Sequence, residues 1–313
     1  MATKTIKGTI YRAFGLSILS EIPLPEVMDL SEQNGDIDVY IKLDISLPTL
    51  WDSLQNEKRK LIVYENLVLF EVPQTAIFGI KDGKNILVCP LKEADFDKIR
   101  LYILGTCIGV LLMQRKILPL HGSAVVINNK AYAIIGKSGA GKSTLATAFI
   151  KNGYQLLSDD VIAVGFEEGD IPYVMPSYPQ QKLWSESMSI FGMETSNYSP
   201  LFERETKFSV PIINDFYSNP LPLSGIFELI KTEERNINFR KIEGLERVQT
   251  VLRQTFRGSL LNQMGLTGWH FNISLNLINK TPIYQLQRPS KGFTASELLS
   301  IILGQINSEG INS

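Results

Sequence analysis

One glycine-rich octapeptide in this sequence has the residue types and spacing of a phosphate-binding loop. Residues 136–143 read GKSGAGKS, which fits the pattern G-x-x-x-x-G-K-S/T at every fixed position. An apolar run, AYAII, precedes the loop and a helical pattern follows it, the context that such a loop requires. The sequence therefore predicts a site for ATP, and we favour this over a glycine-rich turn that matches by chance.

The chemistry of such a loop assigns a role to each residue type. Glycines let the backbone wrap a phosphate chain with its N–H groups turned inward, and the N-terminus of the following helix adds partial positive charge. We expect Lys142 to reach the β- and γ-phosphates and the Ser143 hydroxyl to bind Mg²⁺. The predicted nucleotide-binding residues are Gly136, Ser138, Gly139, Ala140, Gly141, Lys142, Ser143 and Thr144.

Two adjacent carboxylates, Asp159 and Asp160, follow the loop. One carboxylate at such a site can bind the metal while the other accepts the proton of an attacking hydroxyl. Neighbouring residues of an extended segment point to opposite sides, so we expect the two roles to separate. A solvated Ser-Asp-Asp turn is the alternative, and the residues alone do not decide which aspartate takes which role.

Four further polar residues are weaker candidates. His121 enters the strand hairpin that leads to the loop, and the residues leave a functional and a structural role equally open, whereas His270 reads as structural. Arg257 ends a predicted helix and either points at the phosphates or stabilises the helix C-terminus. Lys207 is the weakest of these candidates.

The elements that must position these residues fall into three predicted parts. Residues 1–93 read as a smaller β-rich domain that serves for support or acceptor docking, because apolar residues alternate with polar ones and Asp82-Gly83 marks a turn. Residues 94–116 read as one connecting helix. Residues 117–313 read as the α/β domain that carries the loop.

Within the third part, the patterns predict elements of both kinds. Two strands over 123–135 form a hairpin through Asn128-Asn129-Lys130, and a helix over 143–151 ends at Asn152-Gly153. The remaining predictions are strands over 155–157, 161–164 and 283–286, and helices over 245–257 and 295–306.

Composition limits the class of protein. The net charge is −1, so no global basic field is available to hold nucleic acid. The two cysteines, Cys89 and Cys107, lie far apart, which argues against a disulfide framework. The N-terminus lacks the pattern of a secretory signal, and no apolar run reaches the roughly 20 residues of a membrane-spanning helix. We expect a cytoplasmic protein without membrane partners.

Three segments together resemble a known family. LHGSAVVI, IIGKSGAGKST and GYQLLSDDVIAV, in this order and spacing over residues 119–165, are similar to the catalytic domain of bacterial HPr kinase/phosphorylase. The resemblance implies the P-loop fold that HPr kinase shares with phosphoenolpyruvate carboxykinase. It also implies that Lys142 binds phosphate, Ser143 binds Mg²⁺ and Asp159 is the catalytic base. Asp160 would act through the metal, with His121 supporting the phosphates.

The chain departs from that family after the aspartates. HPr kinase has a signature built around Arg-Gly there, whereas residues 175–184 read MPSYPQQKLW, in which Lys182 alone could replace the cation. This stretch looks more like divergent relatives, some of which phosphorylate a serine of a lasso-peptide precursor. HPr kinase is a hexamer, so the resemblance also makes a homo-oligomer an expectation.

These features together predict an ATP- and Mg²⁺-dependent kinase that acts on a serine hydroxyl of a peptide or small protein. A kinase for a small molecule such as free serine remains open, because the acceptor region is the part that departs from the family. A non-catalytic nucleotide sensor is less favoured, since it would have little need of a catalytic carboxylate. A transporter-type ATPase is least favoured, because its LSGGQ signature is absent.

Overall fold

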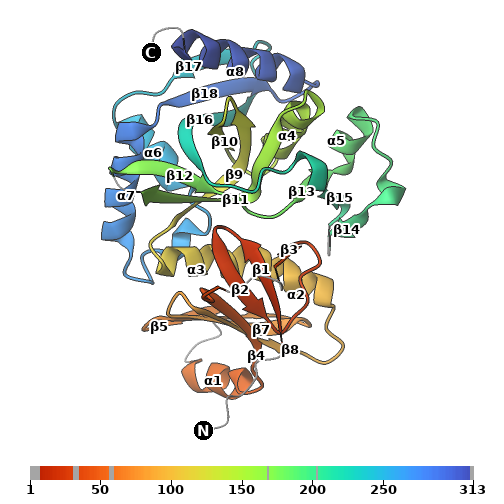
Figure 1. The fold of residues 1–313 in the computed structure, drawn as a ribbon, viewed down its shortest axis with the longest axis vertical. Coiled ribbons are helices and arrows are strands. Elements are labelled where there is room, and N and C mark those ends of the chain that lie inside the picture. Colours follow the sequence, from red (N-terminus) through yellow and green to blue (C-terminus); the bar gives the residue numbers. More distant parts are fainter. Residues whose placement is uncertain (1–7, 31–34, 56–59, 168, 202–203, 311–313) are drawn as a thin grey trace.

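The computed structural model describes residues 8–30, 35–55, 60–167, 169–201 and 204–310, without the side chains of residues 204, 205, 309 and 310. Two large sheets lie one above the other, and a helical segment runs between them (Figure 1). Helices and strands both contribute to the architecture, so the protein is of mixed α/β class.

The lower sheet in Figure 1 comes from the first part of the chain and has eight strands in the order β3-β1-β2-β4-β8-β7-β6-β5. The predicted alternation is confirmed in β4, where Val39 and Ile41 are buried, and Asp82 and Gly83 turn the chain between β7 and β8 with positive φ. Helix α1 (Leu47–Leu54) packs against β7 and β8. The strands are β1 (Thr9–Ala13), β2 (Leu16–Ser20), β3 (Met28–Asp29), β4 (Val39–Leu43), β5 (Leu61–Tyr64), β6 (Leu67–Val72), β7 (Ala76–Lys81) and β8 (Asn85–Pro90).

The helical segment between the sheets follows the single predicted helix closely. It consists of α2 (Phe96–Tyr102), one π-helical turn (Ile103–Cys107) and α3 (Ile108–Gln114). The side chain of Asp95 caps its N-terminus by accepting a hydrogen bond from the N–H of Asp97. Its apolar residues belong to one hydrophobic core together with residues of both sheets, so the segment packs between the sheets instead of linking them through solvent.

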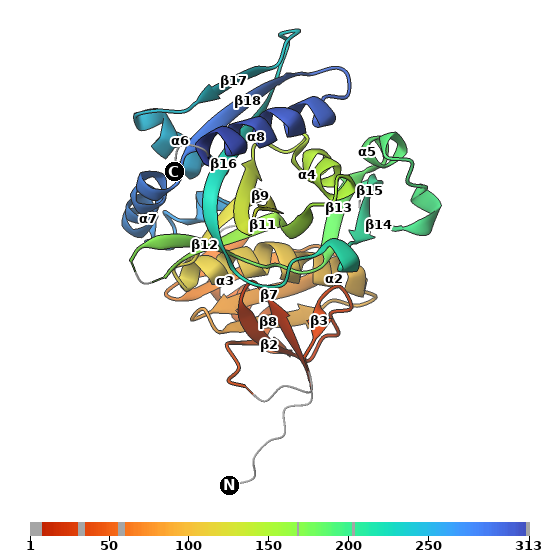
Figure 2. The ribbon, with the colours of Figure 1, turned by 45° about the horizontal axis from the view of Figure 1, so that its top comes forward.

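The upper sheet has seven strands in the order β10-β9-β11-β12-β16-β18-β17, and β10 also pairs with β16. The predicted hairpin is confirmed: β9 and β10 are antiparallel, and Asn128 and Asn129 both have positive φ in the two-residue turn. Alternate residues face opposite sides, with Ile134 packed among α4 and α8 and its neighbours Ala133 and Ile135 among α6 and α7. Helices therefore cover both faces (Figure 2).

The elements of this upper part are β9 (Leu118–Ile127), β10 (Lys130–Ile135), α4 (Lys142–Lys151), β11 (Gln155–Glu167), β12 (Ile171–Met175), β16 (Leu221–Thr232), β17 (Asn238–Lys241), α6 (Leu245–Gln254), α7 (Thr267–Lys280), β18 (Ile283–Pro289) and α8 (Ala295–Gly310).

Two predictions for this part need correction. The strands expected over 155–157 and 161–164 form one strand, β11. The register of its pairing with β9 shifts between Leu156 and Ser158, but the strand continues through this irregularity. A Ser-Asp-Asp turn is therefore absent, because both aspartates lie inside β11. The helix expected over 245–257 ends at Gln254, so Arg257 does not lie at a helix C-terminus.

A small third sheet projects from the side of the upper part (Figure 1). Its order is β13-β15-β14, with β13 (Gln180–Trp184), β14 (Ser199–Leu201) and β15 (Arg204–Pro211), and α5 (Ser185–Ile190) follows β13. Short 3₁₀ turns lie at Thr195–Asn197, Ile213–Asp215 and Gly258–Leu260.

The two large sheets meet through direct contacts as well as through the helical segment. The N–H of Phe14 donates to the carbonyl of Pro176 at 2.7 Å, and the ring of Phe14 lies edge-on to Tyr178. The turn between β1 and β2 therefore borders the stretch after the aspartates, where the sequence departs from HPr kinase.

Candidate active site

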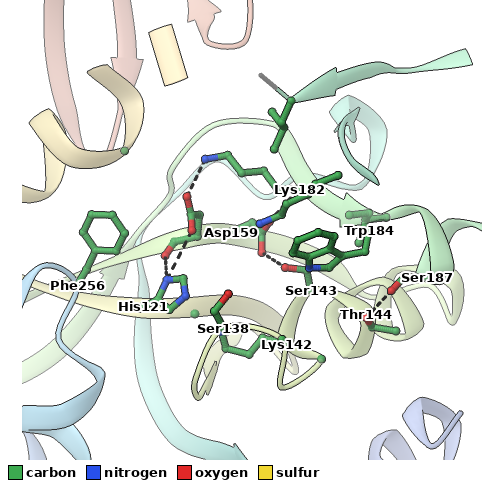
Figure 3. Close-up of a pocket in the computed structure, with 18 of the residues that line it drawn as sticks. His121, Ser138, Lys142, Ser143, Thr144, Asp159, Lys182, Trp184, Ser187 and Phe256 are labelled. Carbon is green, nitrogen blue, oxygen red and sulfur yellow. Dashed lines mark hydrogen bonds and ion pairs between the residues drawn. The ribbon is translucent and has the colours of Figure 1, made fainter. Parts of the chain in front are cut away.

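A cavity of about 610 Å³ lies where the glycine-rich loop, β11, β13 and the helical segment meet (Figure 3). The loop connects the end of β10 to the start of α4, which places it at the carboxyl end of a central strand. Ligands of α/β sheets bind at that end.

Two glycines in the loop have conformations that other residues would strain. At Gly136, φ is +148°, and an added Cβ would lie 2.4 Å from the carbonyl oxygen of Leu229. Gly141 caps α4 with φ of +104°. These positions explain why the sequence pattern requires glycine, and they leave room for the backbone to approach a phosphate chain.

Lys142 is the first residue of α4 and is only 7% exposed. Its ammonium donates to the carbonyl oxygens of Gly136 at 2.8 Å and Lys137 at 3.1 Å, so the loop holds the side chain at the cavity wall. Burial lowers the pKa of Lys142 to about 8, although Asp159 and Asp160 oppose the shift. A phosphate anion beside the ammonium would favour its charged form.

Asp159 is buried and accepts three hydrogen bonds. Ser123 Oγ donates to Oδ1 at 2.6 Å and Ser143 Oγ donates to the same oxygen at 3.1 Å, while the backbone N–H of Lys182 donates to Oδ2 at 2.9 Å. The pairing of β9 with β11 sets Ser123 opposite Asp159. The side chains of the loop serine and Asp159 are therefore in direct contact. A loop Ser or Thr and an Asp are the residue types that bind Mg²⁺ in P-loop NTPases.

Asp160 lies with Lys182 and His121 instead. Lys182 Nζ donates to Oδ2 of Asp160 at 2.7 Å, and the ammonium and carboxylate form an ion pair. Burial alone would raise the pKa of Asp160, but Lys182 and His121 outweigh it and hold the pKa well below its usual value. Lys182 is 6% exposed and belongs to β13, so it is a buried strand residue rather than a lysine of a surface loop.

His121 is fixed by the backbone of Asp160. Its Nδ1 lies 3.0 Å from the carbonyl oxygen of Asp160, and because a carbonyl only accepts, Nδ1 carries the proton in this bond. Burial is the main cause that lowers the pKa of His121, and the nearby charge of Lys142 lowers it further. The ring is therefore mainly neutral at pH 7. Nε2 is then left as an acceptor on a residue that lines the cavity.

Both aspartates line the same cavity although they are neighbours in one strand. Asp160 has φ of +70°, in the left-handed region, which interrupts the alternation of an extended strand. The expected separation to opposite sides is therefore replaced by two different sets of partners at one cavity.

The remaining predicted residues also lie at or near the cavity. Ser138, Gly139 and Thr144 line it, whereas Ala140 is buried in the hydrophobic core beside α4. Thr144 Oγ1 lies 2.7 Å from Ser187 Oγ of α5. Among the described residues, no three His, Cys, Asp or Glu side chains gather into a metal site. A Mg²⁺ bound mainly by phosphates needs only one or two protein oxygens.

Of the other weaker candidates, Arg257 and Lys207 line the cavity, whereas His270 does not. Arg257 lines the cavity and donates to Thr106 Oγ1 of the helical segment at 2.9 Å, while its own φ is +55°. Lys207 also lines the cavity, with Nζ 5.5 Å from the centre of the Trp184 ring. His270 is buried elsewhere and lies 2.8 Å from Thr255 Oγ1.

Sequence reasoning missed Arg288 and Trp184. Arg288 Nε, on β18, donates to the carbonyl of Ala140 at 2.8 Å, so a residue 148 positions away supports the loop and lines the cavity. No local pattern marks Arg288. Trp184, the last residue of β13, also lines the cavity and is drawn there in Figure 3.

Two curated relatives of this chain are both named HPr kinase/phosphorylase. HPr kinase/phosphorylase of Mycoplasmopsis pulmonis is 33% identical over 85 residues, which cover 25% of this chain and 28% of that protein. The Listeria welshimeri enzyme of the same name is 32% identical over 123 residues, 37% of this chain and 39% of its relative. The matches thus span less than two fifths of the relatives' length. No family model matches the chain.

A solved structure, the Hpr(Ser) kinase/phosphatase from Coxiella burnetii, aligns with 62% of this chain and 94% of its own at 16% identity, with a TM-score of 0.34. That score does not establish a shared fold. The resemblance rests on the sequence matches, and they confirm that this chain is similar to HPr kinase/phosphorylase, as its motifs predict.

Proposed function

We propose that this protein is a kinase that transfers the γ-phosphoryl group of ATP to a serine hydroxyl of a peptide or small protein in the cytoplasm. The observation that carries the proposal is one cavity that brings together the glycine-rich loop, the buried Lys142 and two aspartates with different partners. Similarity to proteins named HPr kinase/phosphorylase supports the same reaction class. The finer expectation of a P-loop fold of the HPr kinase and phosphoenolpyruvate carboxykinase type belongs to this proposal.

The residues present fit a magnesium nucleotide. The loop backbone and Lys142 would bind the phosphates, and Ser143 with Asp159 would hold Mg²⁺, which supplies charge neutralisation at the transferring group. Arg288 and Lys231, which line the same cavity, add positive charge near the loop. Phosphoryl transfer needs little covalent help, so positioning and charge would supply most of the rate.

The contacts favour a division of the two aspartates that differs from the sequence-based assignment. The Ser143–Asp159 hydrogen bond supports a metal-binding role for Asp159, and the 22% exposure of the Asp160 side chain supports a role for Asp160 as acceptor of the hydroxyl proton. Lys182, paired with Asp160, would stabilise negative charge on the transferring group. The sequence-based assignment of Asp159 as base stays a prediction, to be decided by the magnesium titration described below.

The acceptor class rests on the stretch after the aspartates. That stretch packs against the lower sheet through Phe14, so residues outside the loop-bearing part border the acceptor side of the site. A ribosomally made precursor peptide, as in lasso-peptide systems, fits this arrangement, and a free-serine kinase is the second candidate. A homo-oligomer is compatible with either.

The test is phosphoryl transfer from γ-labelled ATP with Mg²⁺ to serine peptides and to free serine, with Mg·ATP binding followed by calorimetry. We expect Mg²⁺-dependent labelling of a serine. Tight nucleotide binding with no transfer to any acceptor would favour the sensor, and no nucleotide binding would refute the proposal.

A further inference from the structure

A second cavity of about 460 Å³ adjoins the active site on the side of the lower sheet. Its walls come from three distant segments: the loop after β2 at Pro25 to Met28, helix α2 around Arg100, and the small third sheet around Ser199 and Ser209. The two cavities share Leu101, Lys182 and Leu201 as lining residues, so they are neighbours in space.

Lys182 marks the junction of the two cavities. Its backbone N–H donates to Asp159 and its ammonium pairs with Asp160, while the residue also lines the second cavity. A molecule that fills the second cavity therefore lies next to the residues proposed to hold the metal and accept the proton.

The lining of the second cavity is largely apolar and contains four prolines and two tyrosines. Proline has a fixed φ and tyrosine few rotatable bonds, so binding a ligand there would order little of the protein. Pockets with such walls are pre-formed for their ligands. These lining residues are Pro25, Pro179, Pro200, Pro211, Tyr178 and Tyr198.

One charged group in this wall is incompletely satisfied. Arg100 donates to Oε1 of Glu26 at 2.8 Å and to Oδ1 of Asp97 at 2.6 Å. A single guanidinium thus serves two carboxylates. Oε2 of Glu26 is buried and has no hydrogen-bond partner among the described residues. A buried acceptor without a partner destabilises the protein, so a donor supplied by a ligand would be favoured there.

We infer that the second cavity binds the part of an acceptor peptide that flanks the phosphorylated serine, and that a donor on this part, a basic side chain or a backbone N–H, bonds to Glu26. The inference rests on the proposed kinase function and makes the acceptor a polypeptide segment. An extended chain advances about 3.3 Å per residue, so a few residues would pass from one cavity to the other. Free serine would fit within the first cavity and gain nothing from the second.

The test uses the full chain and a library of twelve-residue peptides with one central serine, flanked by Lys, Glu or Gly, and labelled ATP. Ser209→Trp fills the second cavity and Ile213→Asp places a charge at its edge, where Ile213 is 73% exposed. Leu245→Asp is the control, because Leu245 is 80% exposed and lines neither cavity. We expect kcat/KM for peptides to fall about tenfold or more in the first two variants and to stay unchanged in the control.

Glu26→Gln tests the charge. The Gln amide oxygen can still accept from Arg100, so the fold should persist, while the preference for Lys-flanked over Glu-flanked peptides should shrink by about tenfold. Mg·ATP affinity should not change in any of these variants.

The outcomes separate the inference from the function beneath it. Transfer to free serine without transfer to peptides, or peptide transfer that Ser209→Trp and Ile213→Asp leave intact, would overturn the inference while the kinase stands. A wild-type protein that fails to bind Mg·ATP would instead refute the kinase itself.

Discussion

The phosphate side and the acceptor side of this site are built in different ways. On the phosphate side, residues 136–144 are contiguous, and Lys142 bonds to carbonyls only five and six residues before it. On the acceptor side, Glu26 bonds to Arg100 across 74 residues and Lys182 to Asp160 across 22. One side is therefore encoded locally, and the other exists only after the sheets have packed together.

This difference has a functional meaning. A local loop can keep its geometry while the surrounding sequence changes, and the curated relatives described above match only 25% and 37% of this chain. A site assembled from distant segments can be rebuilt by changes in any of them. We therefore expect reaction type and acceptor choice to respond to different mutations.

The largest effects should come from the aspartates at the boundary between the two sides. Asp160→Asn removes the proposed proton acceptor, and turnover should fall about 10²- to 10⁴-fold at every Mg²⁺ concentration. Asp159→Asn should instead raise the Mg²⁺ concentration needed for half-maximal rate, because its partner is Ser143. A Mg²⁺ titration of both variants measures this.

Unfolding curves and nucleotide calorimetry are the controls for that titration, since both aspartates have several partners. If Asp160→Asn recovers at high Mg²⁺ while Asp159→Asn stays inactive, the roles are the reverse, as the family resemblance first implied.

Lys142→Ala tests the phosphate side alone. Loss of a charged contact to the transferring group should lower kcat about 10²- to 10³-fold. Lys151→Ala, at the exposed end of the same helix, is the matched control and should keep full activity. Near-normal turnover by Lys142→Ala would show that the loop does not bind the reacting phosphates.

The sequence predicted the local features of the molecule well. The hairpin over β9 and β10, the start of α4 within one residue of its predicted position and the long helical segment all follow from short-range patterns of apolar residues, asparagines and glycines. Those patterns act through neighbours in the chain, so they can be read without knowing the fold.

Features that depend on tertiary contacts were not predictable in this way. Lys182 follows two prolines, a sequence that is also compatible with a surface loop, and its burial depends on the pairing of β13 with β15. The positive φ of Asp160 gives no sequence signal, because aspartate adopts many conformations, and Arg288 reaches the loop from a strand near the end of the chain.

The Lys182–Asp160 pair offers a smaller but sharper test of the acceptor side. Lys182→Met leaves Asp160 without its ammonium, and removing one partner of a buried pair typically costs about 3–5 kcal/mol of stability. With Asp160 22% exposed, we expect a value near the lower end of that range. The double variant Lys182→Met/Asp160→Asn should regain part of the loss, which urea unfolding of all four proteins measures. Additive losses would mean that the two residues are not coupled.

The Lys182–Asp160 pair also predicts how the stability of the protein changes at acidic pH. The folded-state pKa of Asp160 is lowered, so its contribution to stability is present above the unfolded-state pKa near 4 and is lost as the pH falls below it. Lys182→Met should reduce this acid sensitivity, whereas a variant on the phosphate side should not.

The smallest expected effect concerns protons at Lys142. Its pKa in the free protein is lowered to about 8 by burial, and bound phosphates would raise it again. At a pH between the pKa of Lys142 in the free protein and its pKa in the complex, Lys142 is mostly deprotonated in the free protein but protonated in the complex. Binding of Mg·ATP at pH 8.5 should therefore take up a proton. Affinity should fall about tenfold between pH 7 and pH 9, because each unit above the free pKa removes up to one tenfold step.

Calorimetry in two buffers with different ionisation enthalpies measures the uptake directly. Lys142→Arg keeps a positive charge that does not titrate in this range, so its uptake should vanish while binding persists. Equal uptake by the wild type and Lys142→Arg would place the titrating group elsewhere in the cavity.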